Sequence, residues 1–219
     1  MASGFLMSRR AALAGIAACG FWDVSSAWAQ AQAFKPSADD AADIARAEAY
    51  LDAIRTLEAR FVQIGPDGSV SEGDFYLARP GRMRLEYDAP NPNLLVADGR
   101  AFVHIDKRLQ TIAYLPVDST PAGLFLRERI QLSNTVSVVG VERGPAVLRI
   151  GLVQASDPRA GRLTLAFSER PFALASWSVT DAQGLVTRLT LVSPIQGRPL
   201  DPKHFAFVDP TLGRERNLR

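Results

Sequence analysis

The sequence contains few side chains whose type and spacing could catalyse a reaction or hold a metal ion. There are two histidines, His104 and His204, and one cysteine, Cys19. Neither histidine has a cysteine or an acidic cluster at the spacing of a metal site, so we expect no bound metal. His104 lies in a stretch with strand character, where a histidine with one hydrogen-bond partner is ordinary.

The patterns typical of enzymes are missing as well. The sequence has no G-x-S-x-G elbow, no G-x-G-x-x-G or other phosphate-binding loop and no H-E-x-x-H helix. The acidic pairs Asp39–Asp40 and Glu86–Asp88 are typical of a helix start and of a solvent-facing strand, not of glycosidase carboxylates. We therefore predict a protein that is not an enzyme and needs no cofactor.

Composition places the chain among globular proteins. It has 219 residues, of which 47% are hydrophobic and 22% are charged. This is enough for one sizeable domain and excludes a disordered chain. The formal net charge is +2 and the basic residues form no block, which argues against dedicated nucleic-acid binding.

The first stretch predicts a cleaved signal peptide. Arg9 and Arg10 give a positive start, a short apolar run follows, and Ala27–Trp28–Ala29 has the small-x-small form that a signal peptidase cuts. We expect residues 1–29 to be removed and residues 30–219 to form a single domain that works outside the cytoplasm.

Two alternatives remain open for this segment. The pair Arg9–Arg10 follows a serine and resembles a twin-arginine export signal, but Ala12 stands where a bulky apolar residue is usual, so ordinary export fits equally well. Residues 16–19 resemble a lipobox, which would acylate Cys19 and tether the protein. We favour loss of Cys19 with the signal peptide.

Two amphipathic helices are expected. Ser37 followed by two aspartates is typical of a helix start. The apolar stripe of this first helix consists of Ile44, Ala47, Leu51, Ile54 and Leu57. Thr120–Pro121 is typical of the start of a second helix, of two to three turns. The apolar residues of the second helix are Leu124, Phe125, Leu126 and Ile130.

The remainder of the chain predicts short strands joined by tight turns. Turn signals such as Asp98–Gly99 separate runs in which apolar and polar residues alternate. This even spacing favours an antiparallel meander that is closed or nearly closed on itself. The expected strands are residues 59–64, 70–77, 82–88, 94–96, 101–106, 110–115, 135–141, 146–153, 162–168, 172–180 and 185–192, with a short final one at 205–207.

A curled sheet of this kind allows two roles for the helices. In an incomplete barrel, the helices can cover the mouth with their apolar faces and enclose an apolar cavity under a movable cover. Alternatively, both helices form a permanent core with the sheet. The residues alone leave these two arrangements open.

Several short motifs follow one another in a recognisable order. They are Phe61–Gln63, Gly73–Arg84 with Arg79–Pro80–Gly81 inside it, Leu94–Gly99, Thr120–Pro121 and Lys203–Phe207. Together they resemble the outer-membrane lipoprotein carrier family, the LolA type, over roughly residues 61–207. The last motif resembles the closing strand of that family.

The resemblance implies a mainly β fold, an unclosed antiparallel β-barrel or half-barrel with a helical lid. It implies a periplasmic carrier, acting as a monomer, that shuttles acylated lipoproteins from an inner-membrane ABC-type releasing complex to an outer-membrane acceptor. Two other functions of the same fold stay open, a periplasmic carrier of free lipid and a module that senses lipoproteins.

The resemblance also assigns site residues. Arg79 corresponds to the latch of the family, which hydrogen-bonds to the lid when no cargo is bound; otherwise it would be an exposed turn residue. Met83, Leu85 and Tyr87 share one strand face and match the lining positions of the family. The complete set of expected lipid-binding residues is Phe61, Phe75, Leu77, Met83, Leu85, Tyr87, Leu94, Val96, Phe102, Leu124 and Phe125.

Overall fold

The computed structural model describes residues 34–117, 120, 122–132 and 136–209. All of them belong to one compact unit, Ala33–Arg219. The expected signal peptide, residues 1–29, and Pro121, expected at the start of the second helix, lie outside the described residues.

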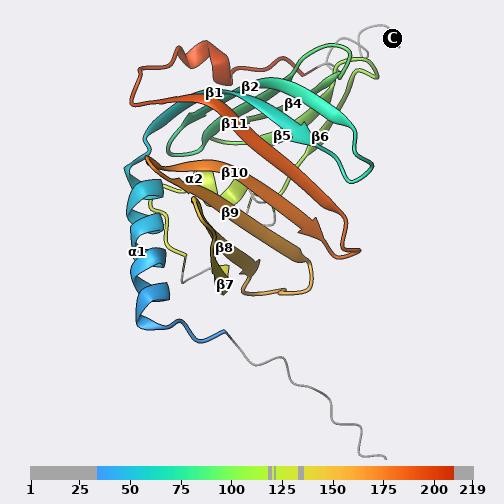
Figure 1. Ribbon diagram of the computed structural model, residues 1–219. Coiled ribbons are helices and arrows are strands. Elements are labelled where there is room, and N and C mark those ends of the chain that lie inside the picture. Colours follow the sequence, from blue (N-terminus) through green and yellow to red (C-terminus); the bar gives the residue numbers. More distant parts are fainter. Residues whose placement is uncertain (1–33, 118–119, 121, 133–135, 210–219) are drawn as a thin grey trace, which may run out of the picture. The chain divides into compact units, whose positions relative to one another are not determined.

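The described residues form mainly one antiparallel sheet of eleven strands (Figure 1). The strands are β1 (Thr56–Ile64), β2 (Val70–Ala78), β3 (Arg82–Tyr87), β4 (Asn93–Asp98), β5 (Phe102–Asp106), β6 (Thr111–Tyr114), β7 (Val136–Arg143), β8 (Val147–Gln154), β9 (Gly161–Glu169), β10 (Phe172–Asp181) and β11 (Val186–Gln196). They follow the order β6-β5-β4-β3-β2-β1-β11-β10-β9-β8-β7. Among the described residues the edge strands β6 and β7 do not pair with each other, so the sheet is unclosed, as predicted.

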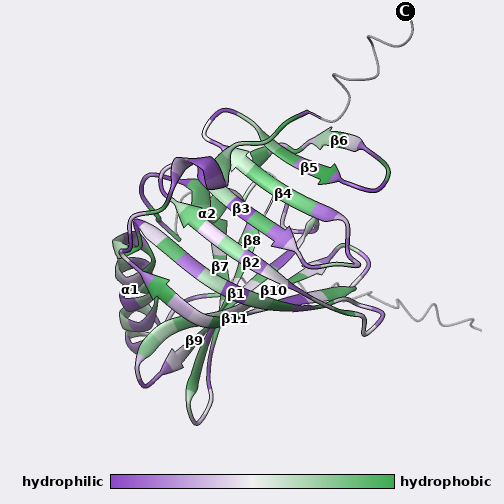
Figure 2. Cartoon of the chain, turned by 90° about the horizontal axis from the view of Figure 1, so that it is seen from above, coloured by the Kyte–Doolittle hydropathy of each residue, from purple (hydrophilic) through white to green (hydrophobic). Residues whose placement is uncertain are grey.

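The sheet is bent as well as twisted. β1, β7 and β10 each contain an irregularity in register, of the kind that bends a strand and increases its twist. In the view from above, hydrophobic and hydrophilic residues alternate along strands such as β1, β2 and β3 (Figure 2). The alternation gives the sheet two distinct faces.

The helix α1 (Ala38–Ala53) begins where it was predicted to begin and packs on β9 and β10. Ser37 is its N-cap and forms a capping box with Asp40, through hydrogen bonds of 3.0 and 3.1 Å. Tyr50 lies edge-on to Phe167 and Phe172, with ring centroids 6.0 and 5.7 Å apart. The aromatic contacts therefore hold the helix against this part of the sheet.

The predicted apolar stripe extends past the end of α1. Ile54 is the C-cap residue, with an extended backbone, and Leu57 lies in β1. Both side chains are buried in the main core. The prediction that they belong to the helix was wrong, because a buried strand start continued the apolar spacing of the helix.

The helix α2 (Ala122–Leu126) is shorter than the two to three turns predicted. The carbonyl groups of the next two residues, Arg127 and Glu128, accept hydrogen bonds from Arg79 and do not continue the helix. The predicted apolar side chains of this region are nevertheless all buried; they are Leu124, Phe125, Leu126 and Ile130. Residues 122–132 are termed the lid segment below.

The C-terminal described segment contains a 3-10 helix, η2 (Pro202–Phe205), where a strand was predicted for residues 205–207. Asp201 caps it by accepting a hydrogen bond from the backbone N–H of Lys203 at 2.9 Å, and a proline follows in the first turn. These two local signals favour a helical turn, so the expectation of a closing strand was wrong.

Apolar side chains pack on both faces of the sheet. The main core lies on the inner face and includes the lid segment and α1. Its fully buried members include Phe61, Leu148, Ile150, Leu165 and Phe167. A smaller cluster lies on the opposite face of β4 and β5, with Phe207 packed against it. The smaller cluster consists of Leu94, Val96, Val103 and Ile105.

Gly73 of β2 allows two aromatic rings to meet in the main core. It pairs with Phe61 of β1 and with Tyr87 of β3, and these rings contact edge to face at 5.1 Å. A Cβ at Gly73 would lie 2.7 Å from the Phe61 ring and 2.1 Å from the carbonyl oxygen of Glu86. The glycine is therefore required by close approach of its neighbours.

We expect Gly73→Ala to lower the free energy of unfolding by about 1–3 kcal/mol, because the methyl group forces the ring or the backbone to move. Gly140→Ala in β7 is the matched control, since nothing lies within 4 Å of a Cβ there; its effect should stay within about 0.5 kcal/mol. Urea unfolding measures both values. Equal stability of the two variants would contradict the tight packing at Gly73.

Candidate functional site

An apolar cavity of about 260 Å³ lies between the lid segment and the inner face of the sheet. One wall comes from β3, β4 and β5, and the other from β10 and β11. The lining residues are Gln63, Met83, Leu85, Tyr87, Leu95, Phe102, Leu115, Thr120, Phe125, Trp177, Val179, Thr187 and Leu189. Most of them are apolar or aromatic, which is typical of a site that encloses an apolar ligand.

The structure brings five of the predicted lipid-binding residues to this cavity. They are Met83, Leu85, Tyr87, Phe102 and Phe125. Four others belong to the same buried cluster but pack against neighbouring side chains and do not line the cavity. These four are Phe61, Phe75, Leu77 and Leu124. Contact of any of these residues with lipid remains a prediction.

Leu94 and Val96 lie on the wrong face of β4 for a role in the cavity. Both belong to the smaller cluster on the opposite face, whereas Leu95, between them, lines the cavity. Successive side chains of a strand point to opposite faces, so the assignment of Leu94 and Val96 was wrong by one residue. Alternation alone could not reveal this, because Leu94, Leu95 and Val96 are all apolar.

Residues of the β10–β11 hairpin line the cavity and were not predicted. Trp177 and Leu189 are directly paired across the two strands. The ring of Trp177 lies 5.1 Å from that of Phe125 in the lid segment. A lone tryptophan in an alternating strand is weak evidence for a cavity-lining position, because the sequence does not show which strands face each other across the interior.

Arg79 follows β2, and its side chain is 0% exposed. Its guanidinium donates hydrogen bonds to two segments that are distant in the sequence. Nε donates to the carbonyl of Arg127 (2.8 Å) and Nη2 to that of Glu128 (2.9 Å), both in the lid segment. Nη1 donates to the carbonyls of Leu51 (2.7 Å) and Ile54 (3.0 Å) at the end of α1. The alternative that Arg79 is an exposed turn residue is therefore wrong.

The end of α1 suits a buried cation for two reasons. The last carbonyl groups of a helix have no partner within it, and the guanidinium supplies donors to them. The C-terminal end of a helix also carries partial negative charge, which favours a cation there. Burial lowers the pKa of Arg79, and the hydrogen bond to Asp52 opposes this shift. The group stays protonated at neutral pH, because arginine starts from a pKa above about 12.

Two acidic side chains of α1 also bind the backbone of the lid segment. Asp52 Oδ1 accepts hydrogen bonds from Nη2 of Arg79 (3.1 Å) and from the N–H of Ile130 (3.0 Å). These bonds, that of Ile130 first, hold the pKa of Asp52 below its usual 3.8. Glu48 accepts a hydrogen bond from the N–H of Leu132. The lid segment is thus attached to α1 by side-chain hydrogen bonds, in addition to the buried apolar cluster that both belong to.

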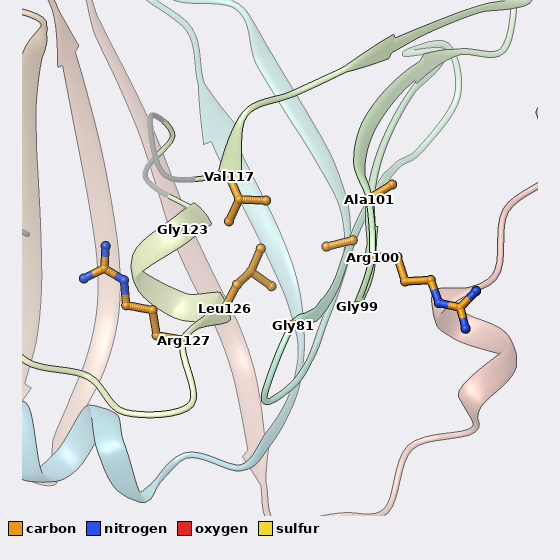
Figure 3. Close-up of a pocket in the computed structure, with 9 residues that line it drawn as sticks. Gly81, Gly99, Arg100, Ala101, Val117, Gly123, Leu126 and Arg127 are labelled. Carbon is orange, nitrogen blue, oxygen red and sulfur yellow. The ribbon is translucent and has the colours of Figure 1, made fainter.

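A second gap, of about 190 Å³, lies beside α2 and next to the turns at Gly81 and Gly99 (Figure 3). Leu126 points toward this gap, whereas Arg100 and Arg127 extend away from it (Figure 3). The N–H of Gly81 donates to the carbonyl of Leu126 at 2.8 Å. On this side the lid segment is therefore held by a backbone hydrogen bond next to open space.

In the described part of the chain, no three His, Cys, Asp or Glu side chains gather in a group that could hold a metal ion. None of its helices combines the length and the hydropathy needed to cross a membrane.

An unclosed antiparallel sheet that curls around an apolar cavity, with a short segment held over it, defines a class of proteins that shelter apolar ligands. Residues 52–208 match the family model described as outer membrane lipoprotein carrier protein LolA, and the chain belongs to this family. The family expected from the motifs is thereby confirmed.

Curated relatives agree with this match. The outer-membrane lipoprotein carrier protein of Methylococcus capsulatus is 35% identical over 75% of this chain and 83% of its own length. That of Pseudomonas paraeruginosa is 29% identical over 78% of this chain and 85% of its own length. Among solved structures, a LolA superfamily protein from Nitrosomonas europaea aligns with 75% of this chain and 97% of its own at 12% identity, with a TM-score of 0.41.

Replacement Asp52→Asn tests the attachment of the lid segment. Because the folded-state pKa of Asp52 is lowered, its carboxylate stabilises the fold above about pH 3.8, and this contribution is lost as the pH falls through the lowered value. We expect a loss of at most about 1 kcal/mol at pH 7, since the side chain is 39% exposed. Urea unfolding at several pH values measures it. The expected difference from wild type shrinks in acid, and a pH-independent difference would contradict the role of the carboxylate.

Proposed function

We propose that the chain is a periplasmic carrier that holds the acyl chains of lipoproteins in the apolar cavity, under the lid segment. In this proposal it takes its cargo from an inner-membrane ABC-type complex, delivers it to an outer-membrane acceptor, acts as a monomer and catalyses no reaction. Family membership supports the choice of cargo. The observation that carries the mechanism is the buried Arg79, which joins the end of α1 to the lid segment, whose Phe125 lines that cavity.

The size of the cavity supports a cycle of opening and closing. A cavity of about 150 Å³ encloses one benzene molecule, so the 260 Å³ found here has room for only a short piece of an acyl chain. Several complete chains do not fit in this closed form. Binding of a lipoprotein therefore requires the lid segment to move away from the sheet.

The hydrogen bonds of Arg79 offset part of the gain from binding acyl chains. Each buried methylene contributes about 0.8 kcal/mol, so three full chains would exceed the practical limit of about −18 to −21 kcal/mol for non-covalent binding. A carrier that bound so tightly could not release its cargo. Opening breaks bonds to a charged group, each with a net value of about 1.5–3 kcal/mol, and closing restores them, which favours release.

We expect Arg79→Leu to fold and accept cargo but to release it more slowly, because the closed empty form loses the bonds that stabilise it. Arg79→Lys keeps the charge without the five-donor fork and should lie between Arg79→Leu and the wild type. The rate of transfer of a labelled lipoprotein to acceptor membranes measures the effect. Transfer by Arg79→Leu as fast as by the wild type would contradict the latch.

We expect Leu85→Glu to abolish the retention of cargo, because it places a charge in the apolar cavity. Val192→Glu is the matched control, since Val192 is 43% exposed on β11 and does not line the cavity. Mass spectrometry of what co-purifies with each variant from the periplasm gives the answer. Acylated protein retained equally by both variants would contradict the cavity as the binding site, and free lipid alone in the wild type would favour a lipid carrier.

A further inference from the structure

A second cavity continues the apolar one at the ends of β1 and β3. Its volume is about 320 Å³, and it shares Gln63, Tyr87, Leu95 and Leu115 with the apolar cavity. The other residues that line it are Asn91, Asn93 and His104. This second cavity is termed the polar compartment. Arg79 precedes β3 and Tyr87 ends it, so the compartment and the latch are separated by roughly the 17 Å length of that strand.

A chain of hydrogen bonds orients the amides of the polar compartment. Asn91 Nδ2 donates to Ser71 Oγ at 3.0 Å, and Asn91 Oδ1 accepts from Nδ2 and the N–H of Asn93 at 2.7 and 3.1 Å. With its Nδ2 directed to Asn91, Asn93 presents Oδ1 to Nε2 of His104, at a distance of 2.7 Å. Since an amide oxygen only accepts, Nε2 carries a proton. Each group is thus held in one orientation.

Gln63 is the donor that stands where the two cavities join. Its Oε1 accepts a hydrogen bond from the hydroxyl of Tyr87 at 2.8 Å. The carbonyl end of the amide is thereby occupied, and the two N–H groups of Nε2 remain as donors. Burial raises the pKa of Tyr87, so its phenol stays neutral and keeps this orientation. Gln63 lines both cavities and can therefore donate to a ligand that spans them.

The chemistry of the lining limits what the polar compartment can bind. Within the described part of the chain, the residues that line it include no Asp, Glu, Lys or Arg. A phosphate group placed there would find no cationic partner among the lining residues. An ester or amide carbonyl needs only N–H donors, which amides supply.

We propose that the polar compartment binds the ester or amide carbonyl groups at which the acyl chains join the cargo, while the chains themselves occupy the apolar cavity. This inference rests on the carrier function proposed above. Every chain attached by an ester or amide begins at such a carbonyl, and the shared lining residues put donors and apolar wall next to each other. The lack of a cation in the lining selects acylated peptides over phospholipids.

The test uses the purified whole chain and three probes with chains of equal length. They are a dipalmitoylated lipopeptide without charged residues, dipalmitoyl phosphatidylglycerol and hexadecane. The lipopeptide should bind about 10-fold or more tightly than the phospholipid. Both probes carry ester carbonyl groups, so this difference reports on the phosphate group, which finds no cationic side chain in the lining. Hexadecane reports on the apolar cavity alone.

Two variants and one control distinguish a loss of binding in the polar compartment from a general loss of structure. Gln63→Leu should weaken lipopeptide binding about 5- to 10-fold and leave hexadecane binding unchanged. Gln183→Leu makes the same change in the exposed turn between β10 and β11 and should have no effect. Asn91→Lys adds a cation to the compartment and should increase phosphatidylglycerol binding about 10-fold, a gain that misfolding cannot produce.

The outcomes distinguish this inference from the carrier function. If the acylated probes bind but the wild type shows no preference, or Gln63→Leu behaves like Gln183→Leu, the polar compartment is overturned and the carrier function stands. An Asn91→Lys chain without increased phospholipid binding also counts against the compartment. If neither acylated probe binds, the carrier function fails and this inference fails with it.

Discussion

One buried cation joins the lid segment to the end of α1. Burying a guanidinium is costly unless acceptors replace its water, and Arg79 finds them in two places, the end of α1 and the lid segment. Neither segment alone satisfies the group. The cation therefore couples the position of the lid segment to that of α1, and withdrawal of either leaves a charge with too few partners.

This constraint gives a reason for the uneven packing of the interior. Beside α1 the core is buried, with Ile150, Leu165 and Phe167 at 0% exposed, and Tyr50 of the helix packs on Phe167. Toward β3, β4 and β5 the interior is hollow. A completely filled interior could not take up a ligand, and a completely hollow one could not position the carbonyl groups that bind Arg79. The sequence left open whether the helices enclose a cavity or form a core with the sheet, and the structure contains both a cavity and a packed core.

Local signals predicted much of the fold, and pairing across the sheet decided what they could not. The Ser37 cap and the Asp98–Gly99 turn act within a few residues, so they could be predicted from the sequence. The order of the motifs indicated the family. The face of Leu95 depends on what covers each side of β4, which is not a local property. The acceptors of Arg79 are mainly backbone carbonyl groups, which leave no trace in side-chain identity. Short motifs could therefore point to Arg79 and to the lid as its partner, but not to the end of α1 or to the individual carbonyl groups that accept its hydrogen bonds.

In the proposed transport cycle, the polar contacts at the two ends of β3 favour opposite states of the carrier. The bonds of Arg79 are formed without cargo, whereas in our proposal the side-chain N–H groups of Gln63 donate to the cargo. The burial of acyl chains favours loading, but the hydrophobic effect does not depend on the orientation of the ligand. Hydrogen bonds with defined geometry at both ends can then set the balance between loaded and empty forms. Because each is worth only about 1–3 kcal/mol, the balance stays close enough to neutral for loading and release both to proceed.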